Sequence, residues 1–142
     1  MKISAIDIGS NSVRLLLWAD GHSLYKKVDT TRLGEGLAAT GRLSAAAMSR
    51  TVEAVGRFAL EAERQGSDKL YVFATAAARG AENGAEFVRL VKDKCGIGVD
   101  VISGEKEAKL GLLGALGGKA GGIIDVGGAS SEVTVSDGKN IV

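Results

Sequence analysis

The N-terminal part of the chain alternates between short apolar segments and turn residues. Residues 2–8 and 13–18 are mostly apolar, which is typical of buried strands. Between them, Gly9–Ser12 supplies glycine, asparagine and serine, which tolerate positive φ or bond to nearby backbone in turns. The pattern predicts a β-hairpin whose tip begins at Asp7. After an Asp-Gly turn, a third strand is expected at about residues 23–30.

A period of 3.6 residues replaces this pattern after Ser44. Apolar residues recur at helical spacing from Met48 to Ala62, Ser44 is a favourable N-cap, and Gly66 is a typical residue for the end of a helix. We therefore predict a helix over residues 44–65.

The rest of the chain alternates strands with helices. Strands are predicted at residues 69–74, 98–102, 123–126 and 132–135, and helices from Asn83 to Lys94 and from about Gly104 to Leu116. Asn83 and Glu86 have the spacing of a capping box, and Ser103 is a suitable cap for the last helix.

The order of these elements predicts the fold class. A three-stranded start followed by alternating helices and strands, βββαβαβα, indicates an α/β fold with a mixed sheet and flanking helices. This order resembles the ribonuclease H-like lobe of the actin/heat-shock-chaperone/sugar-kinase superfamily. The resemblance implies two facing lobes, each beginning with a strand-turn-strand tip that holds phosphate.

Two nearly identical phrases lie near the ends of the chain. IDIGSNS spans Ile6–Ser12 and IDVGGASS spans Ile124–Ser131. The second follows one complete set of lobe elements and a glycine-rich segment, so we expect it to start a second lobe. The predicted division is a first lobe at residues 1–120 and an incomplete second lobe at 121–142, as part of a longer protein. The alternative is that the last hairpin joins the first sheet.

Composition narrows the class of protein. Hydrophobic residues make up 45% of the chain, charged residues 25%, and the net charge is +1, so a globular domain without a nucleic-acid or anionic-membrane partner is expected. No apolar run is long enough to span a bilayer, and the start lacks the apolar core of a secretion signal. The single Cys95 fits a reducing compartment, which predicts a cytoplasmic location. With His22 as the one histidine, a His/Cys zinc site within one chain is excluded.

The repeated tips are candidates for binding phosphate. Glycine, serine and asparagine at a hairpin tip present backbone N–H groups and hydroxyls, whereas an aspartate at the strand end reaches phosphate only through a cation such as hydrated Mg²⁺. The candidate phosphate ligands are Gly9, Ser10, Asn11, Ser12, Gly127, Gly128 and Ser130, and the candidate metal ligands are Asp7 and Asp125. The alternative is two ordinary turns, in which the same residue types are common.

Glu107 and Arg79 are further candidates. Glu107, Gly111 and Gly114 share one helix face, where a carboxylate beside bare glycines can act as a general base on water. The glycines fit close helix packing equally well. Arg79 follows a strand at the sheet edge where ligands gather, and it is either a phosphate ligand or a solvent-exposed loop arginine.

Five motifs in order resemble the exopolyphosphatase/guanosine pentaphosphate phosphohydrolase (Ppx/GppA) family: IDIGSNSVRLLL, RLGEGL, ATAAAR followed by NG, VISGEKEA and IDVGGASSEV. The resemblance covers the N-terminal part of the family's architecture. It implies Mg²⁺-dependent removal of terminal phosphate from polyphosphate or guanosine pentaphosphate.

The resemblance also assigns roles. It implies that Glu107 is the catalytic base and that Arg79 faces the phosphate. Residues on the family's phosphate and metal positions are Asp7, Ser10, Asn11, Ser12, Asp125, Gly127 and Glu132. The chain departs from the family pattern at Lys106 and Ala129. Lys106 either lowers the pKa of the neighbouring glutamate or points to solvent.

Three hypotheses follow for the function. The first is a phosphoanhydride hydrolase acting in a cleft between two lobes. The second is an ATP-dependent small-molecule kinase or ATPase of the same superfamily, and the third is a non-catalytic module that binds polyphosphate or alarmones. Strand edges exposed by an incomplete second lobe would also favour self-association or domain swapping.

Overall fold

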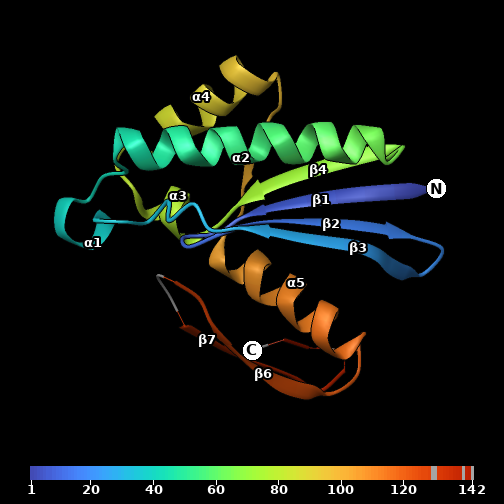
Figure 1. The fold of residues 1–142 in the computed structure, drawn as a ribbon. Helices are drawn as coiled ribbons and strands as arrows, with labels where there is room; N and C mark the ends of the chain where they lie inside the picture. The colour runs from blue at the N-terminus through green and yellow to red at the C-terminus, as the bar shows by residue number, and fades with distance from the viewer. Residues whose placement is uncertain (129–130, 139, 142) are drawn as a thin grey trace.

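The computed structural model describes residues 1–128, 131–138, 140 and 141. Its strands are β1 (Lys2–Ile8), β2 (Val13–Ala19), β3 (His22–Asp29), β4 (Lys69–Ala74), β5 (Asp100–Val101), β6 (Gly121–Val126) and β7 (Ser131–Ser136). Its helices are α1 (Leu37–Thr40), α2 (Ala45–Arg64), α3 (Ala76–Gly80), α4 (Gly84–Cys95) and α5 (Gly104–Leu116) (Figure 1). No helix among these described residues is long and apolar enough to cross a membrane.

Five strands form a mixed sheet in the order β3-β2-β1-β4-β5. β1 is antiparallel to β2, with Ile8 opposite Val13, so the first phrase forms a hairpin tip as expected. β4 lies parallel to β1 on the other side, with Asp7 opposite Phe73. The α/β fold class expected from the order of elements is confirmed. The register places the carboxyl ends of β1 and β4 at the same edge of the sheet.

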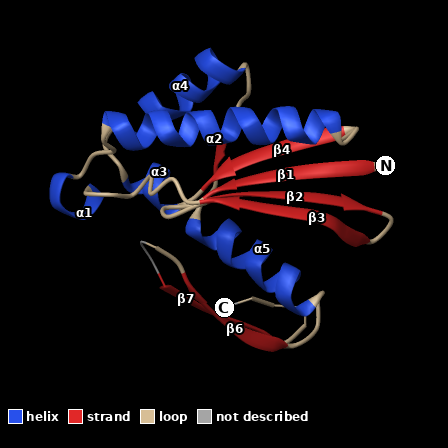
Figure 2. Cartoon of the chain, in the orientation of Figure 1, coloured by secondary structure: helices blue, strands red, loops and turns tan. Residues whose placement is uncertain are grey.

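One face of this sheet carries the core. α2 covers that face and α4 packs on α2, while α5 lies on the other side (Figures 1 and 2). Ile6 and Leu15 from the sheet pack in one cluster with Val55 and Phe58 from α2 and with Phe87 from α4. Full burial of each such side chain contributes about 1.5–3 kcal/mol, so this cluster fixes the edge from which the first tip projects.

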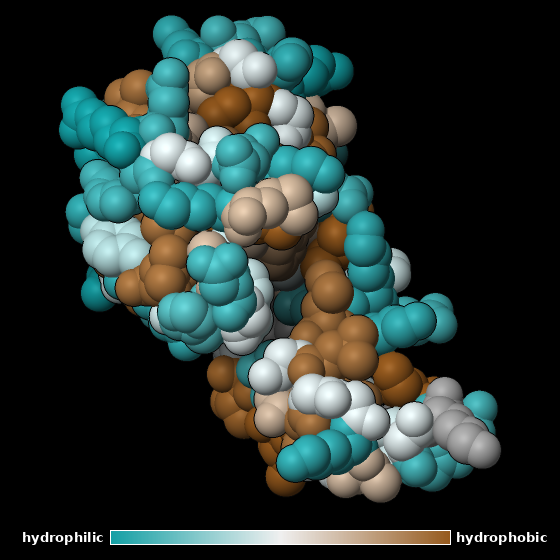
Figure 3. All heavy atoms as spheres, turned by 90° about the vertical axis from the view of Figure 1, so that its right-hand side faces the viewer, coloured by the Kyte–Doolittle hydropathy of each residue, from teal (hydrophilic) through white to brown (hydrophobic). Residues whose placement is uncertain are grey.

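β6 and β7 form a separate two-stranded sheet packed against α5. The alternative in which the last hairpin joins the first sheet is therefore wrong for the described residues. Figure 3 shows apolar side chains gathered where this lower layer meets the upper body. Several apolar side chains of the hairpin are exposed, including Ile124 at 75% and Val133 at 71%. The division into lobes at residue 120 stays a prediction.

The helix caps agree with the sequence in two places and differ in one. Ser44 and Ser103 accept hydrogen bonds from the amides of Ala47 and Lys106, as N-caps should. The capping box at Asn83 is wrong, because its side chain makes no cap bond. Instead, Asn83 bonds to the backbone of Leu43 in both directions, its Oδ1 accepting at 2.8 Å and its Nδ2 donating at 3.0 Å. The Asn83 side chain, which local spacing assigned to the helix cap, therefore bonds to a distant segment of the chain instead.

Two short helices and one strand length also differ from the sequence pattern. α1 and α3 were not expected, because elements this short carry no full period of apolar residues. The strand expected at residues 98–102 is reduced to β5, which pairs with β4 only at Asp100 and Val101.

Candidate functional site

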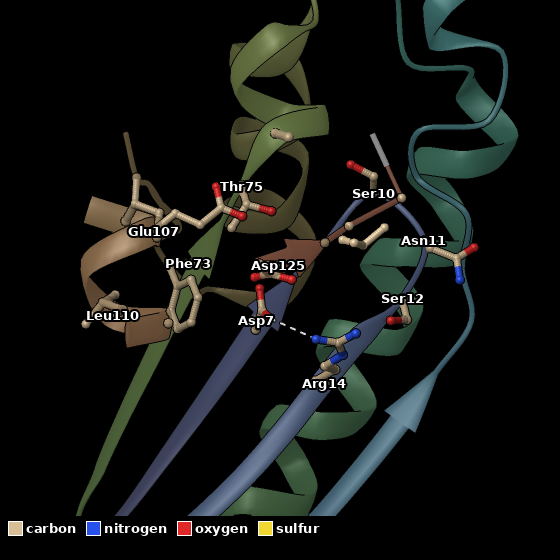
Figure 4. Close-up of a pocket in the computed structure, with 17 residues that line it drawn as sticks. Asp7, Ser10, Asn11, Ser12, Arg14, Phe73, Thr75, Glu107, Leu110 and Asp125 are labelled. Carbon is tan, nitrogen blue, oxygen red and sulfur yellow. Dashed lines mark ion pairs between the residues drawn. The ribbon is translucent and has the colours of Figure 1, made fainter. Parts of the chain in front are cut away.

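The two glycine-rich tips meet in space. A Cβ added to Gly128 would lie 3.1 Å from the Asn11 Cβ and 3.5 Å from the Ser10 Cβ. The first distance is shorter than ordinary van der Waals contact, so a side chain at residue 128 would push the tips apart. The absence of a side chain at residue 128 therefore allows the two repeated motifs to face each other, and Figure 4 shows Asp125 beside Asp7.

A cavity of about 340 Å³ lies between the tips, the end of β4 and α5. It brings together most of the residues that the sequence singled out: Asp7, Gly9, Ser10, Asn11, Ser12, Glu107, Gly111, Asp125, Gly127 and Gly128. Arg79 and Glu132 are not among the lining residues. The predicted phosphate ligand Ser130 and the departure at Ala129 lie outside the described residues.

A loop at residues 32–34 fixes the conformation of the first tip. The amide of Arg32 donates to the Asn11 carbonyl at 2.9 Å, and the amide of Gly34 donates to the Ser10 carbonyl at 2.8 Å. In a trans peptide the N–H points opposite to the carbonyl of the same peptide unit. The amides of Asn11 and Ser12 therefore point away from this loop, as donors for another partner.

Asp7 carries an unsatisfied oxygen at the centre of the site. Its Oδ1 is buried and has no hydrogen-bond partner within the described part of the chain, and its Oδ2 lies 4.0 Å from Arg14 Nη1. Burial raises the pKa of Asp7; the charge of Arg14 opposes this, while the charges of Glu107 and Asp125 add to it. A bound cation would remove this penalty.

The carboxylates of Asp7 and Asp125 are donors that suit Mg²⁺. No group of three or more His, Cys, Asp or Glu residues with the geometry of a metal cluster occurs in the described ranges. Mg²⁺ does not need one, because it is usually held by one or two carboxylates together with waters and phosphate oxygens. Asp7 with its orphaned oxygen and Asp125 on the facing tip fit that requirement.

Arg79 holds Glu107 in place. Its Nη1 donates to Glu107 Oε2 at 3.0 Å and to the Ile102 carbonyl at 2.8 Å. Glu107 stands in the first turn of α5, which Ser103 caps, and its side chain is 21% exposed. The arginine therefore contacts the glutamate and lies behind the cavity wall.

Of the two alternatives for Lys106, the structure shows the exposed side chain and not a contact with Glu107. Its Nζ pairs with Asp100 at 2.8 Å, on the exposed side of the helix start. This contact directs its charge to a different carboxylate.

The second tip supplies two carboxylates on one cross-strand pair. Asp125 of β6 lies opposite Glu132 of β7. Asp125 lines the cavity, whereas Glu132 does not.

Sequence reasoning missed several lining residues: Arg14, Phe73, Thr75, Ala76, Ile102, Leu110 and Val126. Arg14 stands just past the first tip, so its position was a usable signal. Thr75 follows β4, and only the parallel pairing of β4 with β1 shows that it reaches the site.

Comparison with known proteins shows which family the chain belongs to. Residues 18–142 match the Ppx/GppA phosphatase family. The chain belongs to this family. It is 32% identical to "Exopolyphosphatase 2" of Mycobacterium tuberculosis over 154 aligned residues, covering 96% of this chain and 48% of the relative. It is 34% identical to the "Guanosine-5'-triphosphate,3'-diphosphate pyrophosphatase" of Photobacterium profundum, covering 95% of this chain and 29% of the relative.

The fold of this Ppx/GppA family member also matches solved structures. An exopolyphosphatase from Cytophaga hutchinsonii superposes with a TM-score of 0.90 at 25% identity, covering 100% of this chain and 48% of the other. The chain thus spans about half the length, or less, of these relatives. The family resemblance expected from the five motifs is confirmed.

Proposed function

We propose that this chain carries a phosphoanhydride hydrolase site that releases terminal phosphate from polyphosphate or guanosine pentaphosphate. The observation that carries the proposal is the contact between two glycine tips around the unsatisfied carboxylate of Asp7. The names of the relatives, an exopolyphosphatase and a guanosine pentaphosphate pyrophosphatase, support this substrate class.

The tips bind the terminal phosphate. The amides of Asn11 and Ser12 and the hydroxyls of Ser10 and Ser12, facing Gly127 and Gly128, donate to its oxygens, whereas the Gly9 amide already donates to the Ser12 carbonyl. Asp7 and Asp125 would hold Mg²⁺, and Glu132, which lies opposite Asp125 on β7, would be a further carboxylate near the ion. The ion, when bound, neutralises charge on the phosphate.

Glu107 activates the attacking water. Its carboxylate accepts a proton from the water, the water oxygen bonds to phosphorus, and the bridging oxygen leaves with the shortened substrate. Arg79 keeps the carboxylate turned toward the cavity through the 3.0 Å contact. Such positioning lowers the barrier because the water is already oriented.

The test is Mg²⁺-dependent phosphate release from long polyphosphate, guanosine pentaphosphate and ATP, comparing the chain with Glu107→Gln and Glu105→Gln. Glu105 is a matched control because it lies in the same helical turn and is exposed. Loss of a general base costs roughly a hundred-fold or more in turnover, so Glu107→Gln should lose release while Glu105→Gln keeps it.

Each alternative function has its own outcome. Equal release by Glu107→Gln and by the parent chain would contradict the role of Glu107. Binding of the anions without release from any of them would favour a non-catalytic module. Release confined to ATP would favour the kinase or ATPase alternative.

A further inference from the structure

Thr75 stands beside the first tip on the neighbouring strand. It directly follows β4, and its amide donates to the Ile8 carbonyl at 3.2 Å, which continues the parallel pairing of Ile8 with Ala74 by one step. Gly9 directly follows β1, so Thr75 lies next to the first residue of the tip. Figure 4 shows its side chain in the wall of the cavity, near Glu107.

The Thr75 hydroxyl has no hydrogen-bond partner in the part of the chain that the structure describes. The residue is only 7% exposed, yet its side chain makes no hydrogen bond among the described residues. It occupies the N-cap position of α3, where a threonine usually accepts a bond from the helix, and it makes no such bond. Because Thr75 lines the cavity and its hydroxyl is not taken up by the helix, the hydroxyl is free to bond to a ligand there.

The surroundings define the chemistry of that partner. The cavity is also lined by the carboxylates of Asp7, Glu107 and Asp125. These oxygens only accept hydrogen bonds when ionised, and they repel an anion. Glu107 is already bonded to Arg79. A hydroxyl donor beside these carboxylates gives a phosphate oxygen a hydrogen bond that they cannot give, in addition to the charge of Arg14.

We propose that the Thr75 Oγ1 donates a hydrogen bond to an oxygen of the bound terminal phosphate. The hydroxyl adds a third group of donors to the phosphate site, next to the two glycine-rich tips. This inference rests on the proposed phosphate site and adds a ligand from a different strand.

The experiment measures binding of tripolyphosphate with Mg²⁺ by isothermal titration calorimetry, using the whole chain. Thr75→Val keeps the shape and removes the hydroxyl, and Thr75→Ser keeps the hydroxyl. Thr30→Val is the matched control, because Thr30 is exposed and does not line the cavity. A hydrogen bond to a charged group corresponds to roughly a ten-fold change in Kd or more. Thr75→Val should bind at least that much more weakly, while Thr75→Ser and Thr30→Val stay within about three-fold of the parent chain.

A second pair of variants protects the test against misfolding. Thr75→Ala and Thr75→Ser both lack the γ-methyl group and differ only in the hydroxyl. Weaker binding by Thr75→Ala than by Thr75→Ser, at equal melting temperature, supports the proposal. Equal binding by the two overturns it.

Gly128→Ala separates failure of this inference from failure of the site. If Gly128→Ala weakens binding and Thr75→Val does not, the cradle stands and the hydroxyl bond is wrong. If tripolyphosphate binds the parent chain but neither variant weakens it, the cradle itself is misplaced. If the parent chain binds no tripolyphosphate at millimolar concentration, both proposals are overturned.

Discussion

Asp7 combines burial with an unpaired oxygen, and this carries a cost in the free protein. Its pKa is raised above the ordinary value of 3.8, first because burial disfavours the charged form. The folded state therefore holds a proton that the unfolded state has lost, over the range from pH 3.8 up to the raised pKa. Stability falls as pH rises through that range, and the whole penalty is present above it. Charged Asp7 therefore lowers the stability of the fold but is suited to binding a ligand.

We expect Asp7→Asn to raise the melting temperature at neutral pH in Mg²⁺-free buffer, since the variant has no charge to bury. The gain should shrink as pH falls through the window and vanish below about pH 3.8. Thermal melts from pH 3 to 8 check this, with Asp93→Asn, an exposed residue of α4, as control. A neutral-pH melting temperature lower than that of the parent chain would contradict the account. The same variant should lose Mg²⁺-dependent tripolyphosphate binding.

Among the elements, the junction of α3 and α4 is packed most tightly. A Cβ on Gly84 would lie 2.0 Å from the Ala78 carbonyl oxygen, which no relaxation of a side chain can relieve. Ala78 precedes Arg79, the residue that holds Glu107. Gly84 at the start of α4 therefore fixes the position of Arg79 at the end of α3.

Gly84→Ala should destabilise the fold by about 2–3 kcal/mol, the usual cost of overpacking. It should also lower turnover beyond the loss of folded protein, because a shifted α3 moves Arg79 away from Glu107. Gly80→Ala is the matched control, since an added Cβ there meets no atom within 4 Å. Urea unfolding and phosphate release measure the two effects. Similar stability for both variants would show that the junction relaxes at little cost.

Elements with long apolar periods were accessible from the sequence, whereas long-range contacts were not. α2 follows from its apolar period and from Ser44 as its cap, and α5 was predicted from Ser103 as its cap. The bridge from Asn83 to Leu43 spans 40 residues in the sequence, and no local pattern announces it. Arg79 was assigned to the phosphate, but its contact with Glu107 depends on how α5 returns to the end of β4. The sequence therefore predicted most of the cavity residues, but it did not predict the contacts between them.

At the scale of the whole molecule, the site joins two separate sheets. Asp7 belongs to the five-stranded sheet and Asp125 to the β6–β7 hairpin. The two sheets meet where Gly128 contacts Asn11. The hairpin packs on α5, with apolar residues such as Ile124 exposed. A ligand held by both tips would add a second connection between the layers.

Binding of Mg²⁺ and tripolyphosphate should therefore slow amide hydrogen exchange in β6 and β7. A ligand at a hundred times its Kd stabilises the binding-competent state by about 2.7 kcal/mol, so amides whose opening breaks the site should exchange about a hundred-fold more slowly. Exchange in β2 and β3, which belong to the first sheet alone, should change less. Asp125→Ala should abolish the protection of β6 and β7, and Asp93→Ala should keep it. Equal protection in both variants would mean that the anion binds without the second tip, and the two phrases would then be unrelated turns.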